Sequence, residues 1–146
     1  MSEHLLSEDR DGVRVLTLNR PQKKNAINNE MWVALREAFR AAAADDAVRC
    51  VLLCGAGDHF CSGVDLSSFT EMAPGQEHPF ESAARAVVEF DKPLVAAAQG
   101  VAVGGGATVL FHADIVYVGE SLRLRLPFAS LGLVPEWGSS YMLQAN

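Results

Sequence analysis

The longest apolar run of the chain, residues 94–110, constrains the fold most, because glycines divide it into two pieces. The first piece, residues 94–99, is a short apolar segment that follows a proline, which is typical of a buried strand. Three consecutive glycines stand at positions 104–106, and the second piece predicts a helix that continues through His112. The run is too short and too rich in glycine for a membrane span, so no membrane partner is expected.

Three glycines at a strand-to-helix junction can serve two purposes. Backbone N–H groups at a helix start have no partner inside the helix, and glycine lets an anion come close to them. Close packing of the helix against the strand explains the same residues equally well. The spacing excludes a dinucleotide-binding motif and a P-loop, since neither Gly-x-Gly-x-x-Gly nor a Gly-Lys-Ser/Thr ending is present.

Strand-like and helix-like segments alternate along the rest of the chain. Val13–Leu18 is rich in aliphatic and β-branched residues and predicts a strand that ends before Pro21. Apolar residues then recur at helical spacing up to residues 45–46, with Asn28 or Asn29 as the N-cap. By the same criteria we expect strands at 48–54, 114–119 and 122–126, helices at 65–72, 80–90 and from about 138 onward, and a polar break at 73–75. This alternation predicts one α/β domain over residues 1–146, with crossover connections between the strands.

Composition and charge exclude several classes of protein. With 49% hydrophobic residues the chain has enough apolar surface to fold, so disorder is not expected. The net charge of −6, with no basic stretch longer than Lys23–Lys24, argues against a nucleic-acid partner. The three cysteines lack paired spacing, which argues against a disulfide framework and against a zinc site, so no metal is expected. No secretory signal is visible at the N-terminus, and a cytoplasmic protein is expected.

A second candidate for a backbone donor follows the predicted strand at 48–54. The loop there ends in Gly63, Val64 and Asp65 before a predicted helix, an arrangement that exposes a backbone N–H. Asp65 has an equally simple explanation as the N-cap of that helix.

Four segments taken together are much more specific than either glycine motif alone. They are residues 18–28, 60–66, 92–106 and 127–136. In order and spacing they resemble the enoyl-CoA hydratase/isomerase (crotonase) family, over about residues 13–143. The resemblance implies a crotonase-like α/β spiral of β-β-α turns, truncated here before the C-terminal helices that cover the acyl pocket and build the trimer in the family. It also implies an acyl-CoA thioester as ligand and no separate cofactor, because coenzyme A is part of the substrate. A homo-oligomer, trimer or hexamer, is expected if those helices are present.

The resemblance assigns roles to individual residues. The N–H groups of Val64 and Gly105 would form an oxyanion hole for the thioester oxygen. Lys23 or Lys24 would meet the coenzyme A phosphates, unless both are ordinary solvated charges. The residues expected to bind substrate are Lys24, Ala26, Ser62, Val64, Asp65, Leu66, Gly104, Gly105, Pro127 and Leu131.

Glu136 is the candidate catalytic base. Hydratases of the family use two glutamates, and the corresponding positions here hold Thr108 and Phe128, so hydration by the usual route is not expected. Residues 135–141 instead resemble the peroxisomal-type 3-enoyl-CoA to 2-enoyl-CoA isomerases, in which one glutamate takes a proton from C2 and returns it to C4. Such a base works best if an apolar pocket raises its pKa, and we expect Phe128, Leu131 and Trp137 to line that pocket.

Other interpretations stay open. Glu136 can also be a solvated side chain at a helix start. A hydratase, a thioester hydrolase or a decarboxylase of the same family is an alternative activity, and a catalytically silent acyl-CoA-binding or assembly subunit would keep the fold without turnover. Trp137 departs from the isomerase branch, which has a small residue after the glutamate, so the acyl chain length is left undetermined.

Overall fold

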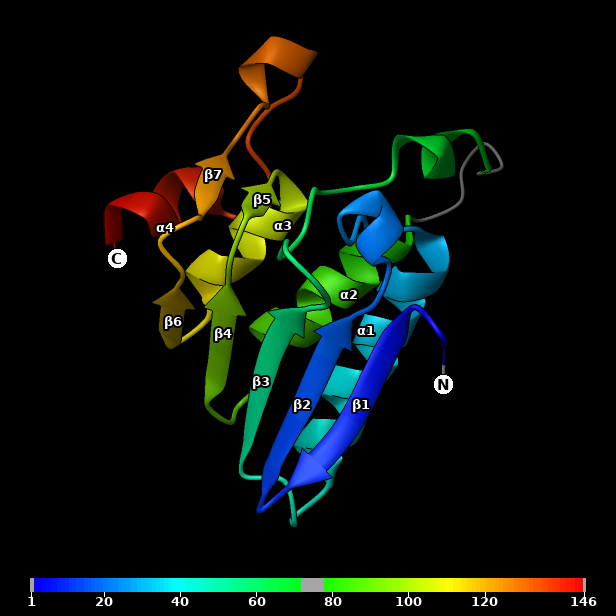
Figure 1. The fold of residues 1–146 in the computed structure, drawn as a ribbon, viewed down its shortest axis with the longest axis vertical. Coiled ribbons are helices and arrows are strands. Elements are labelled where there is room, and N and C mark those ends of the chain that lie inside the picture. The colour runs from blue at the N-terminus through cyan, green and yellow to red at the C-terminus, as the bar shows by residue number, and fades with distance from the viewer. Residues whose placement is uncertain (1, 72–77, 146) are drawn as a thin grey trace.

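The computed structural model describes residues 2–71 and 78–145, and a five-stranded sheet forms its centre (Figure 1). The strand order is β1-β2-β3-β4-β6, in which β1 and β2 are antiparallel and the other neighbours are parallel. The strands are β1 Leu5–Arg10, β2 Val13–Leu18, β3 Cys50–Gly55, β4 Leu94–Ala98 and β6 Ile115–Val118. The four strands predicted for β2, β3, β4 and β6 are therefore confirmed.

The sequence pattern does not indicate β1, and its place in the sheet explains why. β1 lies at the edge of the sheet, and Leu5 is the one buried residue of the strand. It therefore lacks the alternation of apolar and polar residues that marks a half-buried strand. Asp11 and Gly12 connect it to β2 with positive φ angles of 51° and 84°, as in the tight type I′ turn of β-hairpins.

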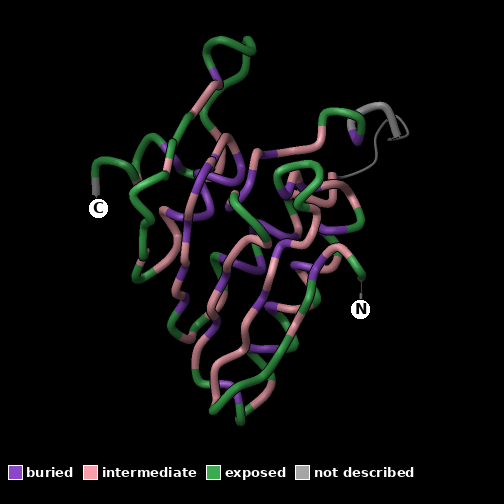
Figure 2. The backbone as a smooth tube through the Cα atoms, viewed as in Figure 1, coloured by how far each residue is buried: buried purple, intermediate pink, exposed green. Residues whose placement is uncertain are grey.

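Two helices, α1 (Asn29–Ala44) and α2 (Pro79–Val88), cover one face of the sheet (Figure 1). Asn28 is the N-cap of α1, because its side chain accepts a hydrogen bond from the N–H of Met31. Burial alternates along the central strands, and the buried residues of strands and helices form one core (Figure 2). Burying each large apolar side chain there stabilises the fold by roughly 1.5–3 kcal/mol. From α1 these side chains are Met31, Trp32, Leu35 and Phe39, and the small Ala42 is buried beside them.

A second sheet of two parallel strands continues from the carboxyl end of β4. It pairs β5 (Val101–Val103), a strand that the sequence pattern does not indicate, with β7 (Arg123–Arg125). The glycines then open α3 (Gly105–Thr108), which passes into the 3-10 turn η3 (Val109–His112), so the predicted helix through His112 is confirmed in outline. The remaining elements are η1 Pro21–Lys23, η2 Leu66–Glu71, η4 Ala129–Leu131 and α4 Ser139–Ala145.

The topology brings the predicted motifs to the carboxyl ends of the parallel strands of the central sheet. Because β2, β3 and β4 are parallel, the chain leaves all three strands at the same edge, where α/β proteins bind their ligands. The predicted strand at 122–126 and the predicted helix from about 138 are confirmed, whereas the polar break at 73–75 lies outside the described residues. In the described ranges, no helix combines the length and apolar character that a membrane crossing needs.

Candidate active site

A cavity of about 630 Å³ opens beside the carboxyl ends of the parallel strands. Its polar side chains include the Glu136 carboxyl, the His78 ring and the Arg125 guanidinium. A largely apolar cavity with a few polar groups is the usual form of a small-molecule site. The apolar wall includes Leu66, Phe80, Val103, Phe128, Leu131 and Leu133.

Val64 brings a free backbone N–H to the cavity wall. The segment around it pairs with Ile27, whose N–H donates to Gly63 O (2.8 Å) and whose O accepts from Asp65 N–H (2.9 Å). In parallel pairing of this kind, the residue between the two bonded residues directs its own N–H to the opposite side. Within the described residues, no acceptor is found for the N–H of Val64.

Gly104 and Gly105 bring a second free N–H to the same wall. Gly104 has φ 52° and ψ −124°, a conformation that residues with a side chain avoid. A Cβ added to Gly105 would lie 3.8 Å from Val64 Cγ2, so the two donor residues adjoin. The described part of the chain holds no acceptor for the N–H of Gly105 either. Two free N–H groups on one cavity wall are an arrangement that can bind an oxygen atom gaining negative charge.

Asn25 fixes the loop that carries the Val64 donor, a role that the sequence pattern does not signal. The residue is fully buried. Its Oδ1 accepts from Arg20 N–H (2.9 Å), and its Nδ2 donates to Ala56 O (2.9 Å) and to His59 O (2.7 Å). Asn25 thereby joins the loop after β2 to the loop after β3. Asn25 has a positive φ of 56°, which asparagine tolerates better than most residues. Because that angle is known only from the structure, the sequence alone gives no sign of the role.

Glu136 is the one carboxylate on the cavity wall among the residues that the structure describes. Its Oε1 lies 3.2 Å from the hydroxyl of Thr108, a fully buried residue of α3. Burial raises the pKa of Glu136, and the hydrogen bond from Thr108 opposes that rise without cancelling it. A carboxylate with a raised pKa binds a proton more readily, as a general base near neutral pH must.

Trp137 does not line the cavity, and that prediction is wrong. Its ring lies behind the wall, edge-on to Phe80 with 5.5 Å between ring centroids and stacked on His112 at 5.0 Å. Glu136 and Trp137 belong to a tight turn, in which Glu136 O accepts from Ser139 N–H (3.0 Å) and Trp137 has a φ of 51°. Phe128 and Leu131 do line the cavity, as predicted.

Comparisons with known proteins identify the family. The family model described as enoyl-CoA hydratase/isomerase matches residues 8–146. This chain belongs to that family. It is 36% identical over 151 residues to the 1,2-epoxyphenylacetyl-CoA isomerase of Escherichia coli (strain K12), with 98% of this chain and 58% of that protein covered. It is 40% identical over 147 residues to enoyl-CoA delta isomerase 2 of Homo sapiens, with 95% of this chain and 37% of that protein covered.

Solved structures of the enoyl-CoA hydratase/isomerase family share the fold of this chain. The crystal structure of an enoyl-CoA hydratase/isomerase from Pseudoalteromonas atlantica T6c matches with a TM-score of 0.91 and 39% identity, over 97% of this chain and 57% of that one. The crotonase-like α/β fold predicted from the sequence is therefore confirmed. The chain spans little more than half of the first curated relative and about two fifths of the second.

Seven of the ten residues expected to bind substrate lie on the cavity wall. Asp65 is not among them, because its carboxylate accepts hydrogen bonds from Ser67 and pairs with Arg20 at 2.9 Å. The hydrogen bond from the Ser67 hydroxyl, followed by that from Arg20, holds the pKa of Asp65 below its usual value. Asp65 thus holds the loop beside the cavity, and its bond to Ser67 N–H agrees with its interpretation as an N-cap. The seven lining residues are Ser62, Val64, Leu66, Gly104, Gly105, Pro127 and Leu131.

Lys24 and Ala26 also lie away from the wall and hold the loop after β2. Lys24 O accepts from Ser62 N–H (2.9 Å), and Ala26 O accepts from the Arg20 guanidinium (2.7 Å). The exposed side chain of Lys24 leaves its expected contact with coenzyme A a prediction.

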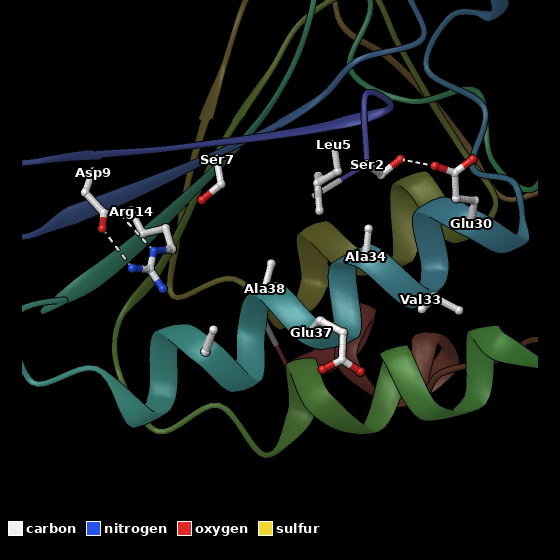
Figure 3. Close-up of a pocket in the computed structure, with 11 residues that line it drawn as sticks. Ser2, Leu5, Ser7, Asp9, Arg14, Glu30, Val33, Ala34, Glu37 and Ala38 are labelled. Atoms are coloured by element: carbon white, nitrogen blue, oxygen red, sulfur yellow. Dashed lines mark hydrogen bonds and ion pairs between the residues drawn. The ribbon is translucent and has the colours of Figure 1, made fainter.

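A larger cavity of about 710 Å³ lies between β1 and α1 and shares no lining residue with the first (Figure 3). Arg14 lies in it but pairs with Asp9 (2.8 Å) and Asp45 (3.0 Å), so its charge is already matched. None of the residues that the family resemblance singles out lies on its wall. In residues 2–71 and 78–145, no three His, Cys, Asp or Glu side chains gather as metal ligands would.

Proposed function

We propose that the chain carries the active site of an acyl-CoA isomerase that converts 3-enoyl-CoA to 2-enoyl-CoA. The observation that supports it most is the pairing of one half-buried carboxylate, Glu136, with the free N–H groups of Val64 and Gly105 around one cavity. The family to which the chain belongs includes proteins named enoyl-CoA delta isomerase, which adds independent support.

The reaction needs one base and one site for a developing negative charge. Glu136 takes a proton from C2 of the substrate, and the electron pair of that C–H bond spreads over the dienolate to the thioester oxygen. The N–H groups of Val64 and Gly105 hold that oxygen as it gains charge. Glu136 then returns the proton to C4, the double bond moves from C3–C4 to C2–C3, and the enzyme regains its starting state.

The same geometry does not favour hydration. Adding water across a double bond requires one group to activate the water and another to deliver a proton. Thr108 supplies a neutral hydroxyl, which is neither a base nor an acid near pH 7. Among the described residues, the cavity wall offers no second carboxylate beside Glu136.

An isomerase acting on an aromatic acyl-CoA is a second candidate. The rings of Phe80 and Phe128 both lie on the cavity wall and suit a ring-bearing acyl group. One relative is named 1,2-epoxyphenylacetyl-CoA isomerase. The oxyanion donors and the carboxylate would keep the same roles in such a reaction.

The test follows the ultraviolet absorbance of the conjugated thioester that forms from 3-enoyl-CoA. We expect turnover by the parent chain and a loss of about 10²- to 10⁴-fold in kcat for Glu136→Gln, the range that general bases contribute. Glu120→Gln is the matched control, since Glu120 is exposed and away from the cavity. Equal turnover by Glu136→Gln would rule out Glu136 as the base. Binding of coenzyme A without turnover by the parent would instead favour the silent acyl-CoA-binding subunit.

A further inference from the structure

We infer that Thr108 is a positioning residue for Glu136: its hydroxyl holds Oε1, so that Oε2 is the oxygen that carries the migrating proton. This inference rests on the proposed one-base reaction and assigns a task to a residue that has no acid–base chemistry of its own.

The Thr108 hydroxyl has two acceptors at the same distance. Its Oγ1 lies 3.2 Å from Glu136 Oε1 and 3.2 Å from Gly105 O. A hydroxyl has one hydrogen to donate, so only one of these bonds can be fully made at a time. A carboxylate is the stronger acceptor, because charge-assisted hydrogen bonds are about twice as strong as neutral ones. The hydrogen therefore points to Glu136 whenever that group is ionised.

Burial makes this contact a specific one. Thr108 is fully buried, so water does not compete for its hydroxyl. Threonine is also branched at Cβ, which limits its side chain to a few rotamers. Glu136 Oε2, in contrast, has no hydrogen-bond partner among the described residues. The two oxygens of the carboxyl group thus differ in their surroundings before any substrate binds.

The consequence for the reaction is geometric. A proton on Oε2 leaves Oε1 as a carbonyl oxygen, which still accepts from Thr108. The same hydrogen bond therefore persists before and after the proton is taken from C2. The carboxyl group can return the proton to C4 without rotating about its C–C bond. It stays fixed to α3, the helix whose first residue, Gly105, supplies an oxyanion donor.

The alternative is that Thr108 only fills space and bonds back to its own helix through Gly105 O. The two roles differ in one measurable respect. The hydrogen bond from Thr108 lowers the pKa of Glu136 against the effect of burial, so removing the hydroxyl should raise that pKa. A residue that only fills space would leave the titration of Glu136 unchanged.

The experiment titrates the side-chain carboxyl carbon of Glu136 by NMR in the ¹³C-glutamate-labelled chain, with Glu136→Gln to assign the signal. Thr108→Val removes the hydroxyl at nearly constant volume, and Thr108→Ser keeps it. We expect Thr108→Val to move the titration to higher pH, to move the acid limb of the kcat–pH profile the same way, and to lower kcat by about 10- to 100-fold with little change in KM. Thr108→Ser should stay near the parent in all three.

The outcomes separate this inference from the proposed reaction. If the chain does not isomerise 3-enoyl-CoA but the titration still moves in Thr108→Val and not in Thr108→Ser, the reaction is wrong and the positioning role holds. If the chain isomerises and the titration is the same in all variants, the positioning role is wrong. Thr108→Ala gives the same comparison where the valine variant does not fold, as thermal unfolding of each variant will show.

Discussion

Replacing each of the two adjacent glycines Gly105 and Gly106 by alanine should have opposite effects on stability. A Cβ on Gly106 would lie 2.6 Å from both Cβ and Sγ of Cys61 and 2.8 Å from its carbonyl oxygen. A Cβ on Gly105 would meet its nearest neighbours, two atoms of the Trp32 ring, at 3.6 and 3.7 Å, which are ordinary contact distances. Gly106 is therefore needed for packing, and Gly105 is not.

Cys61 cannot move aside to make room for a methyl group. Its N–H donates to Val101 O and its O accepts from Val103 N–H, both at 3.0 Å, so its backbone is held on both sides. Overpacking a rigid site costs about 1–3 kcal/mol and sometimes more. Replacing glycine by alanine inside a helix stabilises the fold by about 1 kcal/mol. Because Cys61 is held on both sides, the overpacking cost should lie near about 3 kcal/mol, so Gly106→Ala should lower the unfolding free energy by about 2 kcal/mol. Gly105→Ala should raise it by up to about 1 kcal/mol.

Urea and thermal unfolding of the two variants measure this difference directly. A gap of about 3 kcal/mol between them corresponds to about 9 °C in Tm for a chain of this size, at roughly 3 °C per kcal/mol. The parent should lie between the two. Equal unfolding free energies for Gly105→Ala and Gly106→Ala would refute the packing argument, because the two substitutions differ only in what the new methyl group meets.

Three further predictions follow from buried polar groups. Burial raises the pKa of Glu136, so ionisation of this side chain opposes folding. At pH 7.5 the urea midpoint of Glu136→Gln should match or exceed that of the parent. The difference should disappear as the pH falls below 4.5, the ordinary pKa of glutamate, in paired urea titrations across pH. Asn25→Asp removes the donors to two partly buried carbonyl groups and places a charge at a fully buried position, so it should cost about 3 kcal/mol or more in unfolding free energy. A cost below about 1 kcal/mol would contradict the bonds assigned to Asn25. Burial raises the pKa of the Cys61 thiol to about 12, so Cys61 should not react with a disulfide reagent at pH 8 in the folded chain. The reagent should therefore label as many thiols in native Cys61→Ser as in the native parent. After unfolding in urea, the parent should show one labelled thiol more than unfolded Cys61→Ser.

The elements predicted from the sequence are those whose own residues carry the signal. α1 has apolar residues at helical spacing and an asparagine N-cap, and β2, β3 and β4 are short apolar segments between turns. β5 escaped prediction because its three residues lie between Gly100 and the three glycines, inside one apolar run that shows no alternation. Its partner β7 is equally short, but leucine and arginine alternate around it over residues 122–126, and that alternation is visible in the sequence.

In the candidate site, too, some residues could be assigned from the sequence and others could not. Val64, Gly105 and Glu136 were assigned by resemblance to a family, and all three line one cavity. The side chains that hold Glu136 and the loop before Val64 were not assigned, because each acts across a long stretch of chain. Thr108 meets Glu136 from 28 residues away, and Asn25 reaches His59 from 34 residues away. The identity of a hydrogen-bonding residue is visible in a sequence, whereas the identity of its acceptor depends on the tertiary fold.

The turn after Glu136 shows why a residue that breaks the family pattern can still serve the site. Glu136 O accepts from Ser139 N–H (3.0 Å), and the two residues between them, Trp137 and Gly138, have φ angles of 51° and 65°. Such a turn suits glycine or asparagine at both central positions, and a bulky residue with positive φ costs on the order of 1–3 kcal/mol. The indole offsets that cost by packing edge-on to Phe80 and stacking on His112, whose ring also bonds to Trp137 O at 2.9 Å. With its ring anchored behind the wall, Trp137 fixes the turn from one side while Thr108 holds the carboxyl group from the other, so the candidate base is constrained through both its backbone and its side chain.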